Sequence, residues 1–302
     1  MKRVVTIQDI SCVGKCSLTV ALPIISSMGI ETAVIPTAVL STHTMFKNFT
    51  FRDLSSDIPL IQKHWKAENI DFDSIYTGYL GSIEQIEMLK NFFREFKTDN
   101  NFIFIDPVMG DNGKLYVGFD QEFALKMKEL CKTADVIVPN LTEASYMLEK
   151  EYKENYTEKE IKDLLIELAD LGPKQVILTG ISFKENELGV MAYNKETNKF
   201  FTYFREKIPV KYHGTGDIFA STLVGAMVNN NSLEESLKIA VDYVWETIND
   251  TYKEKKEDAY GVNFETKIPY LINRLKTRDI PQSMRNTLDW GLSLKPCKIN
   301  KK

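Results

Sequence analysis

The sequence predicts an α/β protein of three layers, with a mostly parallel central sheet and helices on both faces. Short apolar stretches alternate with amphipathic ones along the 302 residues, and this alternation is typical of parallel strands joined by crossover helices. Two strand-like stretches, Phe102 to Ile105 and Val136 to Val138, are apolar throughout, as expected for a sheet covered on both faces. The turn-like stretch Asn194 to Asn198 separates two further apolar runs and predicts a late β-hairpin.

The individual elements follow from local patterns. A β-branched run over Arg3 to Ile7 predicts the first strand, and a helix is expected over Ser17 to Met28, ending at Gly29. Further strands are predicted over Thr32 to Leu40, Ser74 to Thr77, Leu188 to Tyr193 and Phe200 to Phe204. Further helices are predicted over Asp57 to Asn69, Ser82 to Phe96, Phe119 to Lys132 and Ala220 to Val228. Capping-box spacing marks three helix starts: Ser82 with Gln85, Thr157 with Glu160, and Ser232 with Glu235.

One domain is expected over residues 1–276, followed by a polar tail over 277–302 that is loosely docked. The apolar share of 43% is enough for a sizeable core. A formal net charge of −4 makes nucleic acid and anionic membranes poor partners. No stretch approaches the ~18 apolar residues of a membrane span, and Asp9 interrupts the short N-terminal apolar run, unlike in a signal peptide. A cytoplasmic protein is therefore expected.

The cysteines do not predict a metal centre. Cys12, Cys16, Cys131 and Cys297 fit no zinc template. We expect reduced thiols that behave as small apolar side chains.

The ends of the predicted strands are where a ligand is expected, because open parallel sheets bind ligands beyond the carboxyl ends of their strands. These ends carry the segments Gln8 to Ser11, Ser41 to Thr44, Thr77 to Gly81, Asp106 to Gly113, Pro139 to Glu143, and Thr179 to Gly180. In four of the segments, polar groups follow an apolar strand directly.

The most informative motif is His213 to Asp217, followed by an apolar helix. Gly214 and Gly216 let the backbone approach a ligand, and successive N–H groups at a helix start can bind a phosphate. Asp217 would repel a phosphate but is suited to take the proton from a hydroxyl that attacks phosphorus. The alternative is that Asp217 only caps the helix. The spacing is not the dinucleotide fingerprint G-x-G-x-x-G, because Phe219 stands at its last glycine.

Two acidic segments predict a place for a divalent ion and a nucleotide. Asp106 and Asp111 follow a buried strand, and paired acids there suit a cation that holds nucleotide phosphates. Aspartate is also an ordinary turn residue, so turn chemistry alone could explain Asp111. Asn140 and Glu143 have the spacing of a capping box, and a helix start beside a nucleotide can both cap and bind.

The segment Gly14 to Ser17 looks like the end of a P-loop but fails that pattern. Asp9 stands where the first glycine is required, and Cys16 stands where a hydroxyl residue is required. Lys15 is therefore not predicted to be a P-loop lysine. No G-x-S-x-G elbow is present.

In this order the motifs resemble the ribokinase-like superfamily, and within it the pyridoxal kinase branch. The similar segments are PTAVLSTHT (Pro36 to Thr44), TGYLGS (Thr77 to Ser82), DPVMGDNGKLY (Asp106 to Tyr116), VPNLTEA (Val138 to Ala144) and PVKYHGTGDIFAS (Pro209 to Ser221). DPVMGD with GTGD is specific for the superfamily, and STHT with TGYLGS narrows the resemblance to the B6 branch. The similarity extends to about residue 275.

The resemblance implies ATP-dependent phosphorylation of the 5′-hydroxymethyl group of pyridoxal, pyridoxine or pyridoxamine. It implies Mg²⁺ and optionally a monovalent cation as cofactors, and a homodimer. Asp217 would be the base, and Gly214, Thr215 and Gly216 would form the anion hole for the γ-phosphate. A loop over Asp111 to Gly118 would close over ATP.

The resemblance also implies roles for the strand ends. Mg²⁺, its waters and the nucleotide phosphates would be arranged by Asp106, Asp111, Asn140 and Glu143, with Asp106 and Glu143 serving the metal. Thr179 would lie on the ATP side. The pyridine ring would be held by Thr44, Tyr79 and the turn Gln8 to Ser11, including Asp9 and Ser11.

The chain departs from many pyridoxal kinases on the side of the vitamer. Asp9 replaces a serine, Met45 replaces a glutamine, and the loop Ile10 to Lys15 is shorter. Asp9 could pair with a ring nitrogen or an aminomethyl group, or it could only cap the turn before Ser11. Hydroxymethylpyrimidine kinase, of the same superfamily, therefore remains the alternative function. A non-catalytic vitamer-binding protein is a further alternative, although it would not need Asp217.

Overall fold

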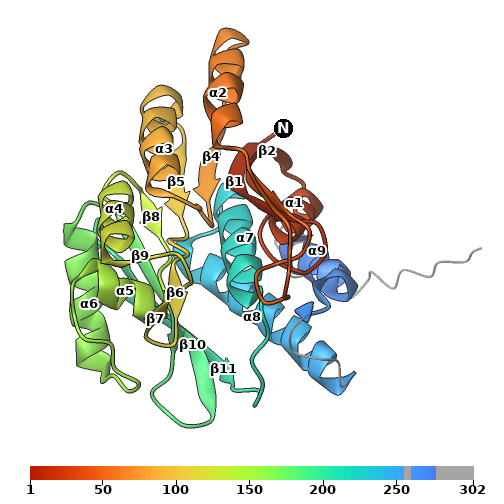
Figure 1. Cartoon of the computed structure of the whole chain (residues 1–302). Coiled ribbons are helices and arrows are strands. Elements are labelled where there is room, and N and C mark those ends of the chain that lie inside the picture. The colour runs from red at the N-terminus through yellow and green to blue at the C-terminus, as the bar shows by residue number, and fades with distance from the viewer. Residues whose placement is uncertain (255–259, 277–302) are drawn as a thin grey trace, which may run out of the picture.

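A nine-stranded sheet with the order β11-β10-β9-β8-β5-β4-β1-β2-β3 runs through the part of the chain that the structure, a computed structural model, describes: residues 1–254 and 260–276 (Figure 1). Strands β2, β1, β4, β5, β8 and β9 are parallel, and β3, β10 and β11 are antiparallel to their neighbours. Their bounds are β1 Arg3–Ser11, β2 Glu31–Leu40, β3 Phe51–Asp53, β4 Ser74–Thr77, β5 Phe102–Ile105, β8 Val136–Ile137, β9 Gln175–Ile181, β10 Glu187–Asn194 and β11 Lys199–Glu206.

Helices cover both faces of the sheet, as Figure 1 shows. One face carries α1 (Leu18–Ser27), α7 (Thr215–Val228), α8 (Leu233–Lys253) and α9 (Ile268–Lys276), with the 3-10 turn η3 (Phe264–Lys267) before α9. The other carries α2 (Ile58–Ala67), α3 (Ile83–Phe96), α4 (Gln121–Cys131), α5 (Leu141–Met147) and α6 (Glu158–Asp170), with η1 (Ser55–Asp57) before α2. The predicted fold class is thus confirmed.

Alternate residues of the central strands serve two separate cores. Val4 of β1 packs with α1 and α7, whereas Val5 and Ile7 pack with α2 and α3. Side chains along a strand point to opposite faces in turn, and both faces are covered, so every one of these positions is apolar. No helix in the two described ranges is long and apolar enough to cross a membrane.

The predicted late hairpin is confirmed by the antiparallel pairing of β10 with β11. The capping box of Thr157 with Glu160 forms in both directions. Ser82 and Ser232 each accept only the forward bond, from the backbone N–H groups of Gln85 and Glu235. The predicted tail over 277–302, with Cys297, lies outside the described residues.

Two predicted boundaries were wrong in ways that matter for the site. Strand β1 does not end at Ile7 in a turn over Gln8 to Ser11, because pairing with β2 extends it to Ser11 across a bulge between Gln8 and Ile10. Helix α7 begins at Thr215 and not at Ala220, with Gly214 as its N-cap. Asp217 therefore lies in the first helical turn, and the interpretation that it caps the helix was wrong.

A small hairpin, β6 (Gly110–Asp111) with β7 (Lys114–Leu115), was not predicted. It stands apart from the main sheet and follows β5. It matters because it lies over the start of α5.

Candidate active site

Four carboxylates gather at the edge of the sheet where the parallel strands have their carboxyl ends. Asp9 comes from β1, Asp106 follows β5, Glu143 lies in the first turn of α5, and Asp217 lies in the first turn of α7. Burial raises the pKa of Asp9 and of Asp106, and the charge of Asp217 raises both further. Like charges this close call for a cation or a proton between them.

The start of α7 is open to an anion. Gly214, the N-cap, has φ +79°, and no side chain caps the helix. The first-turn N–H groups of a helix have no partner within the helix, and they favour a bound anion. A Cβ added at Gly214 would lie 1.9 Å from the carbonyl oxygen of Lys15, so only glycine fits at this turn. Thr215 and Gly216 follow it, as the anion-hole prediction requires.

Asp217 has the environment of a general base. Its Oδ2 accepts a hydrogen bond of 3.0 Å from the backbone N–H of Ser17. Burial raises the pKa of Asp217 to about 6, and the Ser17 bond opposes that rise. A carboxylate with this pKa is ionised at neutral pH but accepts a proton more readily than an exposed aspartate does.

Asp106 and Glu143 form a buried acidic pair. They are 8% and 3% exposed, and neither forms an ion pair with a lysine or arginine of residues 1–254 and 260–276. Burial raises the pKa of Glu143 to about 8, while burial and the charge of Glu143 hold the pKa of Asp106 well above its ordinary value. A divalent cation would neutralise the negative charge of the pair, and carboxylate oxygens are the ligands that Mg²⁺ prefers.

The donor set fits an ion that keeps water and phosphate ligands. Glu143 accepts from the backbone N–H groups of Asn140 at 2.8 Å and Met109 at 3.2 Å, so its oxygens are partly engaged. The described residues contain no group of three or more acids, histidines or cysteines that could hold a metal by themselves. Mg²⁺ commonly takes one or two carboxylates and completes its shell with water and substrate phosphates.

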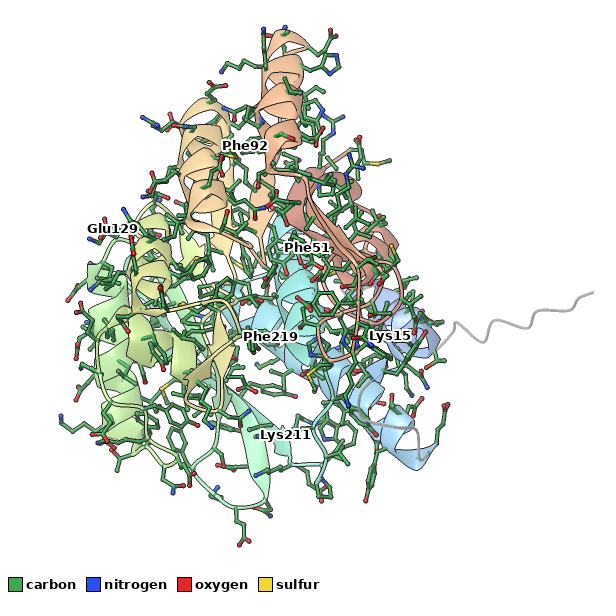
Figure 2. All side chains as sticks on the ribbon, viewed as in Figure 1. Lys15, Phe51, Phe92, Glu129, Lys211 and Phe219 are labelled. Atoms are coloured by element: carbon green, nitrogen blue, oxygen red, sulfur yellow. The ribbon has the colours of Figure 1, made fainter. Side chains whose placement is uncertain are left out.

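The β6–β7 hairpin is tied to this acidic pair. The side chain of Asn140 donates to the carbonyl of Gly110 at 2.8 Å, and Gly113 N–H donates to Thr142 Oγ1 at 2.9 Å. From the other side, Lys211 Nζ donates to Asn112 Oδ1 at 2.6 Å; Figure 2 labels this lysine on the stretch that leads to α7. The hairpin is thus hydrogen-bonded both to the start of α5 and to the stretch before α7.

Two predicted nucleotide residues are placed by this hairpin and by β9. Asp111 is the exposed last residue of β6, next to the turn of the hairpin, and its Oδ1 accepts from the N–H of Asn112 at 2.8 Å. Thr179 forms a bridge with Asn140, and its N–H donates to Pro139 at 3.1 Å. Thr179 therefore lies beside the start of α5. The nucleotide roles of both residues remain predictions.

Only some of the predicted substrate residues lie together in the structure. Asp9 is 4% exposed and sits in the bulge of β1, where its Oδ2 accepts from the hydroxyl of Ser11 at 3.2 Å. The half-buried ring of Tyr79 packs against Phe119, with centroids 5.6 Å apart, and Asp9 contributes to raising its pKa. Thr44 is exposed. Asp9 and Tyr79 are thus brought together, while Thr44 lies on a surface loop.

Sequence reasoning missed several residues here. The backbone of Ser17 contacts Asp217, and the ring of His43 packs on that of His213 with centroids 4.4 Å apart. Tyr116 lies close enough to Glu143 and Asp111 for both charges to raise its pKa. His213 and Tyr116 belong to the quoted motifs, so the motifs could have pointed to them. Nothing local marks Ser17.

Comparison with known proteins identifies the family to which the chain belongs. Residues 22–262 match the family model of phosphomethylpyrimidine kinase. The chain belongs to this family. The resemblance to ribokinase-like kinases is thereby confirmed, and the protein is a phosphotransferase with an alcohol group as acceptor.

Members of the kinase family with different names resemble the chain. A pyridoxal kinase of Dictyostelium discoideum is 26% identical, over 84% of this chain and 88% of its own. A hydroxymethylpyrimidine/phosphomethylpyrimidine kinase of Aquifex aeolicus is 25% identical, over 72% and 81%. A Bacteroides thetaiotaomicron protein, assigned as a phosphomethylpyrimidine kinase and crystallised with pyridoxal, is 38% identical; the two structures superpose with a TM-score of 0.87, covering 93% of this chain and 96% of that one.

Proposed function

We propose that this kinase transfers the γ-phosphate of ATP to the 5′-hydroxymethyl group of a B6 vitamer: pyridoxal, pyridoxine or pyridoxamine. The observation that carries the proposal is the position of Asp217. It lies in the first turn of an uncapped helix, with anion-binding N–H groups beside it, and close enough to Asp106 and Asp9 for its charge to act on both. A hydroxyl placed beside Asp217 would lie next to the base and next to a phosphate bound by these N–H groups.

The chemistry of transfer would be divided among the site residues as follows. Asp217 takes the proton from the attacking hydroxyl, and the N–H groups of Gly214, Thr215 and Gly216 stabilise the charge on the transferred phosphoryl group. Asp106 and, through water, Glu143 would hold Mg²⁺, which neutralises phosphate charge when it is bound.

The ATP side of the site is completed by Asn140, Thr179 and Asp111. Asn140 and Thr179 lie together at the start of α5, where the helix dipole favours an anion. Asp111 lies on the β6–β7 hairpin, and we propose that the segment Asp111 to Gly118 closes over the nucleotide. A closed segment would exclude water from the transfer.

The acceptor side supports a flat, polar ring. Tyr79 offers an aromatic wall, and Asp9 and Ser11 offer polar partners within the bulge of β1, with Thr44 at the rim. A pocket with an apolar wall and a few fixed polar groups is what such a ligand needs. The Bacteroides relative crystallised with pyridoxal has the same fold, which supports a B6 vitamer.

Hydroxymethylpyrimidine is the second candidate acceptor. Two observations favour it: the description of the matching family and the presence of Asp9, since a buried carboxylate can pair with the amino group that this pyrimidine carries. We also propose a cytoplasmic homodimer, on the resemblance to pyridoxal kinases. Size-exclusion chromatography with light scattering tests the dimer, and rates with K⁺ or Na⁺ test a monovalent-ion requirement.

Release of ADP from ATP and Mg²⁺ tests the proposed function directly. The acceptors are pyridoxal, pyridoxine, pyridoxamine and hydroxymethylpyrimidine, with a ribose control. The proposal expects the largest kcat/KM with one of the vitamers. A larger value with hydroxymethylpyrimidine would replace the substrate, while vitamer binding in calorimetry without ADP release would indicate a non-catalytic binding protein.

A further inference from the structure

Lys15, in the loop between β1 and α1 (residues 12–17), has more partners than a surface lysine. Its Nζ lies 2.8 Å from Glu265 Oε2 and donates to Asn263 Oδ1 at 3.0 Å. The ring centroids of Tyr260 and Phe264 are 5.9 and 5.8 Å from the same atom, within the range of cation–π attraction. Only 13% of the lysine side chain is exposed. Figure 2 shows it between the N-terminal segment and the C-terminal helices.

The partners of this lysine are themselves fixed to α8. The N–H of Asn263 donates to Thr251 Oγ1 at 2.8 Å, and its side chain donates to Glu254 Oε2 at 2.8 Å. The hydroxyl of Tyr243 donates to the carbonyl of Phe264 at 2.8 Å. The lysine is thus attached to an anchored segment and not to a loose end.

The backbone of Lys15 supports the anion-hole turn. A Cβ added at Gly214 would lie 1.9 Å from the carbonyl oxygen of Lys15, and one added at Gly261 would lie 2.9 Å from its Cβ. Real Cβ atoms do not approach another atom this closely, so both glycines pack directly against Lys15. The Gly214 turn therefore rests directly on the β1–α1 loop, and it cannot keep its position if the loop moves.

The same loop also positions the base. Ser17, two residues after Lys15, has φ +49° and ψ −133°, a strained conformation for a residue other than glycine. Such strain costs on the order of 1–3 kcal/mol and persists only where the surroundings hold it. In this conformation the N–H of Ser17 donates to Asp217 Oδ2.

We propose that Lys15 is a positioning residue for phosphoryl transfer: by fastening the β1–α1 loop to the segment 260–265, it holds the Ser17 N–H against Asp217 and the Gly214 turn in place. The inference rests on the proposed function, with Asp217 as the base, but not on which alcohol is the acceptor. The ammonium group acts through the loop, because Glu265 and Asn263 already engage it.

The test compares Lys15→Met with the wild type. Small misplacements of reacting groups cost up to ~10²-fold in rate, so we expect kcat to fall by about 10- to 100-fold while KM for ATP stays within about twofold. Hydrogen exchange should accelerate at residues 12–18, because their local opening becomes easier. Lys15→Arg keeps a cation beside Glu265 and should restore most of kcat.

Lys267→Met is the matched control. Lys267 pairs with Glu246 and Asp250 at 3.5 and 2.9 Å, so it fastens the same C-terminal segment to α8 without touching the β1–α1 loop. Its loss should leave kcat and the exchange of residues 12–18 unchanged. If Lys15→Met fails to fold, Glu265→Gln removes only the charge partner of Lys15. This variant should also show a lower kcat and faster exchange at residues 12–18, but to a smaller extent.

Three results would overturn the inference. One is a Lys15→Met protein with the kcat of the Lys267→Met control; another is a raised KM for ATP at unchanged kcat, which would make the lysine a nucleotide ligand. The third is unchanged exchange at residues 12–18. That readout needs no turnover, so it stays decisive even if the wild type releases no ADP with any alcohol tested.

Discussion

The phosphate half and the acceptor half of the site are built differently. In the phosphate half, backbone groups hold two of the functional carboxylates: Asn140 and Met109 N–H groups bind Glu143, and Ser17 N–H binds Asp217. In the acceptor half, the side chains of Ser17 and Ser11 hydrogen-bond Asp9, and the ring of Tyr79 packs against that of Phe119.

This difference separates reaction type from substrate choice. Backbone contacts survive most substitutions, so the phosphate half can keep its geometry while the acceptor half changes its side chains. Asp9, which the resemblance marks as a departure from many pyridoxal kinases, lies in the acceptor half. We therefore expect substitutions in the phosphate half to lower the rate with every acceptor, and substitutions in the acceptor half to change the ranking of acceptors.

The largest effect is expected at the base. Asp217→Asn cannot take the proton, so kcat should fall by about 10²–10⁴-fold with every acceptor. ATP binding in calorimetry and the thermal midpoint should stay close to wild type. Glu129→Gln, on the exposed surface of α4, serves as the control and should keep full activity. A normal kcat for Asp217→Asn would show that Asp217 is not the base.

The second effect concerns Mg²⁺. Asp106→Ala and Glu143→Ala each remove one member of the acidic pair, so the Mg²⁺ concentration for half-maximal rate should rise by about 10- to 100-fold. ADP release measured across a Mg²⁺ series gives this value, with Glu129→Gln again as control. Unchanged Mg²⁺ dependence in both variants would mean that the pair does not serve the metal.

The third effect tests whether the acceptor half chooses among substrates. If Asp9 pairs with the aminomethyl cation of pyridoxamine, Asp9→Ser should weaken kcat/KM for pyridoxamine by about 10- to 100-fold more than for pyridoxal, since a charge-assisted hydrogen bond contributes roughly 1.5–3 kcal/mol. Ser11→Ala, which alters the partner of Asp9 and leaves its charge, is the control. Equal losses on both vitamers would exclude the aminomethyl pairing.

The fourth effect is on stability and follows from the pKa of Asp9. Burial raises this pKa from 3.8 to about 6, so the folded state binds the proton more tightly than the unfolded state. The cost of the buried charge is absent below pH ~4, grows up to pH ~6, and is fully present above it. Asp9→Asn should therefore stabilise the protein at pH 7.5, by up to about 3 kcal/mol.

Denaturant unfolding at pH 4 and pH 7.5 measures this difference. The two proteins should have similar stability at the lower pH and diverge at the higher one. A difference independent of pH would mean that Asp9 already has a compensating partner, and the contrast between the two halves would weaken.

Local patterns in the sequence determined the layers and the place of the site. Strands such as Phe102–Ile105 and helix starts such as Thr157 with Glu160 formed as predicted. Asp106 and Glu143 could be grouped in advance, because parallel strands bring their carboxyl ends to one edge wherever the sheet forms. Asp217 was joined to them by the resemblance of its motif to ribokinase-like kinases.

Only the tertiary structure decided the end of β1, the start of α7 and the support of the base. β1 runs on to Ser11 because β2 offers hydrogen-bond partners as far as Leu40. Lys15 and Glu265 are 250 residues apart in sequence, and the N–H of Ser17 meets Asp217 across a similar separation. Local sequence sets the conformational preferences of neighbouring residues, whereas contacts of this range depend on how every layer packs, and no short segment carries that information.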